Sequence, residues 1–146
     1  MKKILPILLG LIVGLIFTKI FYTSYNINYT FNENTKIYVF QQGVYSSLES
    51  VEKNVNLNYY IYEKNNDMYY VYAGFTTKNE NIEKLKGFFE KKGYSIYVKE
   101  LNMQSNSFTE VLKQYDLLLE RTDDENTIET IIASTLSEYE EVYNEN

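Results

Sequence analysis

The sequence predicts an α+β fold in which one antiparallel-type sheet is built in the order β-α-β-β-α-β. One transmembrane helix is expected before this sheet domain and a helical hairpin after it. The main observation is an internal repeat, in which Gly43 recurs as Gly74 and residues 51–53 recur as 82–84, each about 31 positions later. Such a period indicates a supersecondary unit that is used twice.

A second pair of similar segments closes the two halves of the repeat. Residues 58–62 recur as 93–97, about 35 positions later, and the extra residues amount to about one helical turn. The repeat therefore predicts a small domain with pseudo-twofold symmetry. A symmetric domain of this size favours a binding module over a catalyst.

Residues 1–23 are predicted to be a transmembrane anchor. Residues 4–22 are apolar with two exceptions and would span about 28 Å as a helix, close to the roughly 30 Å of a bilayer core. Lys2 and Lys3 precede this run, so the positive-inside rule keeps the N-terminus cytoplasmic and exports the rest of the chain.

The alternative for this segment is a cleaved signal peptide, but no small-x-small cleavage site follows the apolar run. Gly10 and Gly14 form a GxxxG pattern, which permits a homodimer without requiring one. Residues 24–35 are polar and rich in asparagine, and they are expected to form a linker between the membrane and the domain.

The first half of the repeat predicts a strand, a helix and a second strand. β-Forming residues at 36–42 end at a glycine and indicate the first strand. Ser46 or Ser47 fits the N-cap of a short helix. Residues 59–63 then predict the second strand, and a polar hairpin turn follows at 64–67.

The second half predicts a third strand at 69–75 and a longer helix that Thr76 or Thr77 can cap. Gly93 is expected at the C′ position of that helix, and residues 94–100 predict the fourth strand. Both helices are expected on one face of the sheet, which leaves the other face open.

Three segments of this region resemble SPOR domains. Residues 40–46 are similar to the opening motif of that family, an apolar residue followed by Gln-x-Gly-x-aromatic-Ser, and residues 70–75 and 93–98 are similar to later strands. The resemblance covers residues 36–100, near half of the chain. It implies a ferredoxin-like sheet that binds peptidoglycan, with a preference for glycan strands stripped of stem peptides, often near division or sporulation septa.

The alternation of side chains along strands predicts which residues line the open face. In the fourth strand the apolar positions face the helices, which leaves Ser95, Tyr97 and Lys99 on the open face. The repeat then places tyrosines of the second strand beside them. The expected glycan-binding platform consists of Val39, Gln41, Tyr60, Tyr62, Tyr69, Val71 and Tyr97.

The residue types of this platform suit a sugar ligand. Tyrosine rings can lie against the C–H faces of sugars while their phenols hydrogen-bond to hydroxyls. Gln41, which matches the motif glutamine of the family, offers a donor and an acceptor to an N-acetyl group. The alternative is structural, because cross-strand tyrosines also stabilise sheets that bind nothing.

Gln42 occupies a position that should point at the core. Either the strand carries a bulge there or the expected register is wrong by one residue, which would flip every side chain to the other face.

Residues 101–146 predict a helical hairpin. Ser107 is expected to begin a capping box with Glu110, and apolar stripes follow at 108–119 and 128–142, separated by a turn. The hairpin can pack on the helices of the domain, pair with another chain, or lie over the open face of the sheet. The last arrangement would cover the platform.

The composition argues against catalysis and against a metal or cofactor site. The chain has no cysteine and no histidine, which removes the thiolate nucleophile, the commonest general base and the commonest metal ligand. The carboxylate pairs at 123–124 and 140–141 lie among solvated charges, so no acid–base pair is expected. No enzyme activity, cofactor or metal is therefore predicted.

The charge argues against nucleic acid as a partner. The formal net charge is −6, and beyond the N-terminal segment, which holds Lys2, Lys3 and Lys19, 11 basic residues stand against 20 acidic ones. Phosphate backbones and anionic membrane surfaces would repel such a domain.

Two functional hypotheses follow. In the first, the protein is a single-pass protein of a bacterial cell membrane whose extracytoplasmic domain binds peptidoglycan glycan strands through the open face, in cell division or sporulation. In the second, the domain is a protein-interaction module of a membrane-bound sporulation or division complex. Mutation of Gln41 or Tyr69 should weaken wall binding under the first, and mutation of Leu118 or Ile132 should disrupt a complex under the second.

Overall fold

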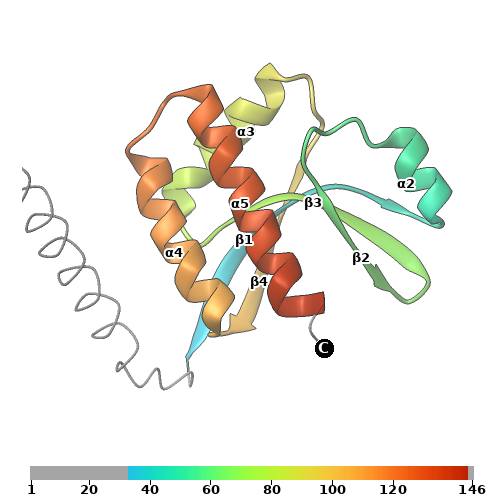
Figure 1. The fold of residues 1–146 in the computed structure, drawn as a ribbon, viewed down its shortest axis with the longest axis horizontal. Coiled ribbons are helices and arrows are strands. Elements are labelled where there is room, and N and C mark those ends of the chain that lie inside the picture. The colour runs from blue at the N-terminus through green and yellow to red at the C-terminus, as the bar shows by residue number, and fades with distance from the viewer. Residues whose placement is uncertain (1–32, 145–146) are drawn as a thin grey trace, which may run out of the picture. The chain divides into compact units, whose positions relative to one another are not determined.

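The computed structural model describes residues 33–144 (Figure 1). The elements are β1 (Asn34–Tyr45), α2 (Leu48–Asn54), β2 (Ile61–Asn65), β3 (Met68–Thr76), α3 (Asn79–Lys91), β4 (Tyr97–Gln104), α4 (Ser107–Glu120) and α5 (Glu125–Asn144). The α+β class and the predicted order of strands and helices are confirmed.

The expected anchor at 1–23 lies outside the described residues, as does most of the expected linker at 24–35. None of the helices found within residues 33–144 combines the length and the apolar character that crossing a bilayer requires.

The four strands form one sheet in the order β2-β3-β1-β4, and every neighbouring pair is antiparallel. β2 and β3 are joined by Asn66 and Asp67, whose φ angles are 48° and 59°. Two consecutive residues with positive φ make the tight turn that matches the twist of a β-hairpin. The predicted polar turn at 64–67 is therefore confirmed.

Two of the predicted helix ends are also confirmed. The Ser47 hydroxyl caps α2 by accepting a hydrogen bond at 3.2 Å from the backbone N–H three residues later. At the end of α3, Gly93 has a φ of +78°. The N–H groups of Gly93 and Tyr94 donate to the carbonyls of Glu90 and Phe89, each at 2.9 Å, which is a Schellman motif.

The predicted cap of α3 is wrong. Its N-cap is Lys78, which makes no side-chain cap hydrogen bond. The hydroxyls of Thr76 and Thr77 instead donate to the carboxylate of Asp116, which lies on α4. A partner distant in the sequence has therefore replaced the local cap.

The predicted cap of α4 is wrong by one residue. Asn106 is the N-cap, and it forms a reciprocal capping box with Thr109. The Thr109 N–H donates to the Asn106 side chain at 3.0 Å, and the Asn106 N–H donates to the Thr109 hydroxyl at 2.9 Å. The predicted pair, Ser107 and Glu110, lies one position after the observed pair, Asn106 and Thr109.

The fourth strand is displaced from its predicted position at 94–100. β4 spans Tyr97–Gln104, because Tyr94 completes the cap of α3 and the next two residues connect that cap to the sheet. β4 therefore crosses the boundary that was expected at residue 100 between the repeated domain and the hairpin.

Two bulges interrupt the pairing of β1 with β3. The ladder skips Ala73 of β3 opposite Phe40 and Gln41, and it skips Gln42 of β1 between Gln41 and Gly43. Each skipped residue shifts the alternation of its strand by one position. The bulge that Gln42 suggested is confirmed. The bulge at Ala73 was not predicted. Because of it, the side chains of the residues before Ala73 in β3 point to the opposite face from the one that simple alternation assigns them.

The α4–α5 hairpin lies over one face of the sheet, which we call the hairpin face (Figure 1). Phe75 of β3 contacts Phe108 of α4 and Tyr139 of α5, with ring centroids 5.4 and 4.8 Å apart. Ile37 and Val39 share this face of β1 and are buried. The hairpin therefore covers much of the face that was expected to be open.

The opposite face, which we call the far face, is also covered in part. Phe40 lies there, and its ring centroid is 5.8 Å from that of Phe89 on α3. A Cβ atom at Gly74 would meet both Phe89 and Ile132 of α5 at 3.8 Å. β2 pairs only with residues 68–72 of β3. The rest of β3 therefore has one unpaired edge, and α3 and α5 come together beside it at Gly74. The expectation that one face stays open is wrong.

The sheet and the hairpin share one hydrophobic core. Its members include Ile37, Val39, Phe40, Phe75, Leu85, Phe89, Phe108, Leu112, Ile132 and Leu136. Residues 101–144 are therefore packed into the same unit as the repeat.

Candidate functional site

The seven residues of the predicted platform do not share a face. Val39, Gln41 and Tyr97 lie on the hairpin face, Tyr62, Tyr69 and Val71 lie on the far face, and Tyr60 precedes β2. The bulge at Ala73 separates the first two groups, because it reverses the alternation that would have placed them together.

The prediction made from the internal repeat also assigns Tyr62 to the wrong face. Tyr62 pairs with Val71 of β3, whereas its counterpart Tyr97 pairs with Gln41 of β1. The two equivalent tyrosines consequently point to opposite faces of the sheet.

Three of the predicted residues, Val39, Val71 and Tyr60, pack against other parts of the fold. Val39 and Val71 are buried members of the hydrophobic core. Tyr60 is half-buried and lines a hollow against Leu136 and Ser137 of α5. None of the three presents a free face to a large ligand.

The far-face tyrosines form a cross-strand cluster. Tyr62 and Tyr69 meet edge to face, with ring centroids 5.8 Å apart. The Lys64 ammonium lies 5.7 Å from the centroid of the Tyr69 ring. Tyr62 remains 47% exposed, but its ring and that of Tyr69 already stabilise the β2–β3 hairpin.

The hairpin face keeps one accessible aromatic surface, at the start of β4. The side chain of Tyr97 is 67% exposed there, and Gln41 lies directly across from it on β1. Lys99 follows two residues later on the same face, and its ammonium lies 5.4 Å from the centroid of the Tyr70 ring. We call these four residues, Gln41, Tyr70, Tyr97 and Lys99, the Tyr97 surface.

The strand order explains how Lys99 reaches Tyr70. β1 lies between β4 and β3, so the lysine side chain crosses β1 to reach the ring. Its ammonium forms no ion pair with any carboxylate of the described residues. The cation–π contact fixes the direction of the side chain, and the ammonium keeps its capacity to donate hydrogen bonds.

The Gln41 amide is not used by the fold. Its Oε1 is buried without a hydrogen-bond partner among the described residues. An unpaired buried acceptor costs about 1–3 kcal/mol. Such a group is a candidate for ligand binding, because a ligand donor reaching it after a small side-chain rotation would recover that free energy.

The Tyr97 surface offers an exposed phenol ring, an amide and an ammonium within one face of three strands. The ring can pack against apolar C–H groups, while the amide and the ammonium hydrogen-bond to hydroxyl or carbonyl oxygens. The arrangement is suited to holding an uncharged polar chain.

A carboxylate near this surface is engaged with two phenols. Glu63 accepts hydrogen bonds from Tyr72 at 3.3 Å and from Tyr139 at 3.2 Å. Burial, and then the charge of Glu63, raises the pKa of both phenols well above the usual range of tyrosine. Both phenols are therefore neutral donors at physiological pH, which makes this a structural cluster.

Within residues 33–144, no three side chains of Asp, Glu, His or Cys gather in an arrangement that could hold a metal ion. Comparison with family models, with curated proteins and with solved structures found no match. The resemblance of residues 36–100 to SPOR domains therefore remains a prediction.

Sequence reasoning left Tyr70 and Lys99 out of the platform. Lys99 was expected on the open face but was not counted as a binding residue, and Tyr70 was expected to point inward. Local alternation indicated the orientation of Lys99 correctly. Nothing in the sequence around Tyr70 indicated its orientation, which depends on the bulge three residues later.

Proposed function

We propose that this protein is a non-enzymatic, single-pass membrane protein whose extracytoplasmic domain binds peptidoglycan glycan strands through the Tyr97 surface. The observation that carries the proposal is the exposed ring of Tyr97 beside the Gln41 amide, which has no partner in the fold. The strand order β2-β3-β1-β4 is the order expected of a ferredoxin-like sheet and supports the resemblance to SPOR domains.

The proposed binding surface is smaller than the platform expected from the sequence. Val39 and Val71 are excluded because they are buried, and Tyr62 and Tyr69 because they lie on the far face. The remaining surface suits a single glycan strand that runs over the uncovered end of the sheet. Localisation to sites of wall remodelling in division or sporulation is part of the same proposal.

Retention of the full-length protein, in detergent, on purified sacculi tests the proposal. Sacculi treated with an amidase, which strips stem peptides, should retain the wild type best. We expect Tyr97→Ala and Gln41→Ala each to weaken retention about three- to tenfold, the loss expected when one ring contact or one neutral hydrogen bond is removed.

Tyr62→Ala is the matched control, because Tyr62 is a comparably exposed tyrosine on the opposite face. It should leave retention unchanged. Failure of the folded wild type to bind either preparation would refute glycan binding, and an equal loss in all three variants would refute the assignment to the Tyr97 surface.

A second candidate function, docking of a protein partner, is favoured by the outer side of the hairpin. Leu118 is 53% exposed and borders an apolar groove of about 400 Å³ between α4 and α5, which Tyr115 and Ile131 also line. Ile132 is unsuited to a test because it is buried against Gly74. Under this function, Leu118→Asp should abolish the complex with the protein partner. Neither the wild type nor any variant should be retained on the wall.

A further inference from the structure

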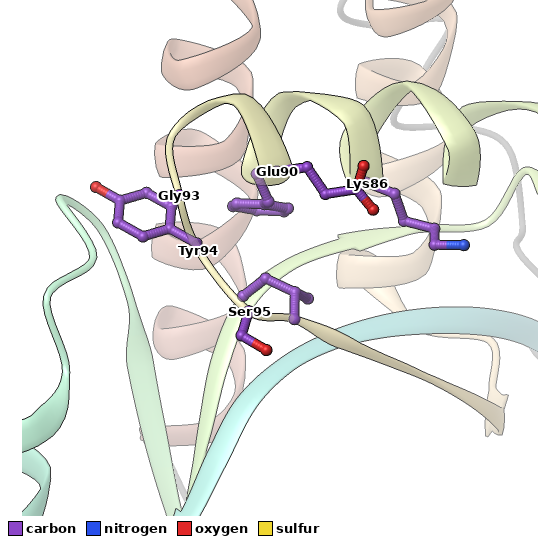
Figure 2. A pocket seen from close by; sticks show the side chains of 7 residues that line it. Lys86, Glu90, Gly93, Tyr94 and Ser95 are labelled. Atoms are coloured by element: carbon purple, nitrogen blue, oxygen red, sulfur yellow. The ribbon is translucent and has the colours of Figure 1, made fainter.

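The last two turns of α3 and the segment that follows enclose a hollow of about 360 Å³ (Figure 2). Figure 2 shows Lys86 and Glu90 on α3 at one side of the hollow, with Tyr94 and Ser95 on the connection to β4 at the other. Phe89 and Ile96 complete the lining. Lys84, which faces the end of α4, does not line it, so the hollow opens on a different side of α3 from the hairpin.

The polar groups around the hollow are not used by the fold. The side chains of Glu90, Tyr94 and Ser95 make no hydrogen bond or ion pair with another residue of the described chain. Lys86 contacts only Glu83, at 3.3 Å on the helix surface, and such exposed pairs contribute little to stability. Glu90, Tyr94 and Ser95 can therefore bind a ligand without loss of internal contacts, and Lys86 would give up only its surface pair with Glu83.

The charges at the rim favour neither an anion nor a cation. One ammonium, on Lys86, and one carboxylate, on Glu90, border the same hollow. An anion would be attracted by Lys86 and repelled by Glu90, and a cation the reverse, so neither sign of charge gains a clear advantage. A neutral molecule with several hydroxyls would accept from the ammonium and donate to the carboxylate.

The lining and the size indicate the shape of that ligand. Phe89, Ile96 and Tyr94 supply the apolar and aromatic part of the lining. The volume lies near the lower end of the range for small-molecule sites, about 300–1,000 Å³. A sugar ring fits this combination, because it presents apolar C–H groups on its faces and hydroxyls around its edge.

We propose that this hollow binds one ring of a neutral saccharide, with Glu90 and Ser95 hydrogen-bonding to its hydroxyls and Tyr94 packing on its face. Residues 95 and 96 lead directly into Tyr97, so the hollow lies at the same end of β4 as the Tyr97 surface, and a glycan strand would have to pass around that end, since α3 packs on the far face and Tyr97 lies on the hairpin face. The inference rests on the proposed function, since the hollow would hold a further ring of the same glycan strand.

Amide NMR of the isotope-labelled full-length protein in detergent micelles, titrated with the unbranched tetramer of N-acetylglucosamine, tests the inference. We expect shifts at residues 89–96 as well as at Gln41, Tyr97 and Lys99. Glu90→Gln keeps the shape of the side chain but removes its charge. It should weaken the affinity measured at residues 89–96 about tenfold, the loss expected for a charge-assisted hydrogen bond.

Glu80→Gln is the matched control, since Glu80 is an exposed carboxylate on the first turn of α3 that does not line the hollow. It should bind as the wild type does. Shifts confined to Gln41, Tyr97 and Lys99 would overturn the inference and leave the proposed function standing. Shifts confined to residues 89–96 would support the hollow and contradict the Tyr97 surface, and shifts at neither place would overturn both.

Discussion

At the scale of single residues, three glycines have different surroundings that set what each position tolerates. Gly74 lies between two helices, with Phe89 and Ile132 each 3.8 Å from where a Cβ would be. Gly87 has nothing within 4 Å of that position, and Gly93 has a positive φ. The glycine repeat at 43 and 74, which first indicated the fold, thus includes a position where two helices pack closely.

Gly74→Ala should change the free energy of unfolding by less than about 1 kcal/mol, because its methyl group would make ordinary contacts. Gly74→Leu should destabilise the protein by about 2–3 kcal/mol, because the larger side chain would push α3 and α5 apart. Urea denaturation midpoints measure both changes. A Leu variant as stable as the Ala variant would show that the two helices do not pack around Gly74 as described.

Gly93→Ala should destabilise the protein by about 1 kcal/mol, because Gly93 has a φ of +78°, where a Cβ atom is strained. Gly87→Ala is the matched control on the same helix. It should stabilise by about 0.5–1 kcal/mol, since alanine favours a helix interior and the space around the position is open. Thermal unfolding of both variants shows whether each change in stability has the expected sign. A destabilised Gly87→Ala would mean that a neighbour occupies that space.

At the scale of elements, one buried carboxylate joins the hairpin to the sheet. Asp116 of α4 accepts hydrogen bonds from the Thr77 N–H at 2.7 Å and from the Thr77 hydroxyl at 2.6 Å. The Thr76 hydroxyl and the Asn81 amide, the latter at 3.2 Å, also donate to it. The aspartate thereby ties α4 to the junction of β3 and α3.

Asp116→Ala should destabilise the protein by about 3 kcal/mol, because it leaves several buried donors without an acceptor. Asp123→Ala is the matched control, because that carboxylate is exposed and contacts only Lys84. It should cost less than about 1 kcal/mol. Chemical denaturation monitored by tyrosine fluorescence measures both. Equal effects would indicate that water satisfies the Thr76 and Thr77 hydroxyls when Asp116 is absent.

The elements that could be predicted from the sequence are those fixed by local chemistry. Ser47, the turn at 64–67 and Gly93 were placed correctly because capping and positive φ depend on a few adjacent residues. The caps at Thr76 and Thr77 were wrong because their partner, Asp116, lies about forty positions away. Asp116 lies four residues after Leu112 and three before Leu119, on the same helix face as these two residues of the apolar stripe, so its spacing was a local signal of burial that was not used.

The candidate site depended on register, which is harder to predict. The bulge at Gln42 left a trace in the sequence, a polar residue at a core position. The bulge at Ala73 left none, because alanine is acceptable on either face. One unrecognised residue was therefore enough to divide the predicted platform between two faces.

At the scale of the whole molecule, Glu63 and the two buried phenols link stability to alkaline pH. The pKa values of Tyr72 and Tyr139 are raised in the folded state, first by burial and then by Glu63. Below a pH of about 10, the unperturbed pKa of tyrosine, both phenols are neutral in the folded and unfolded chains. At higher pH only the unfolded chain releases these protons, so stability should fall.

We expect urea midpoints to decrease as the pH rises above about 10. Tyr72→Phe and Tyr139→Phe should each reduce the slope of that decrease, because each removes one of the two phenols. An unchanged slope in both core variants would contradict the role of these phenols.

The position of the hairpin at the C-terminal end of the described chain has a consequence for biogenesis. Phe75 belongs to the first two-thirds of the fold, yet Phe108 and Tyr139, which pack against its ring, are synthesised last. Until α5 has emerged from the ribosome, the sheet presents an uncovered apolar face, the type of surface that chaperones bind and that leads to aggregation. An interrupted chain ending after β4 would leave this face uncovered, so both helices of the hairpin must be synthesised before the domain reaches a stable state.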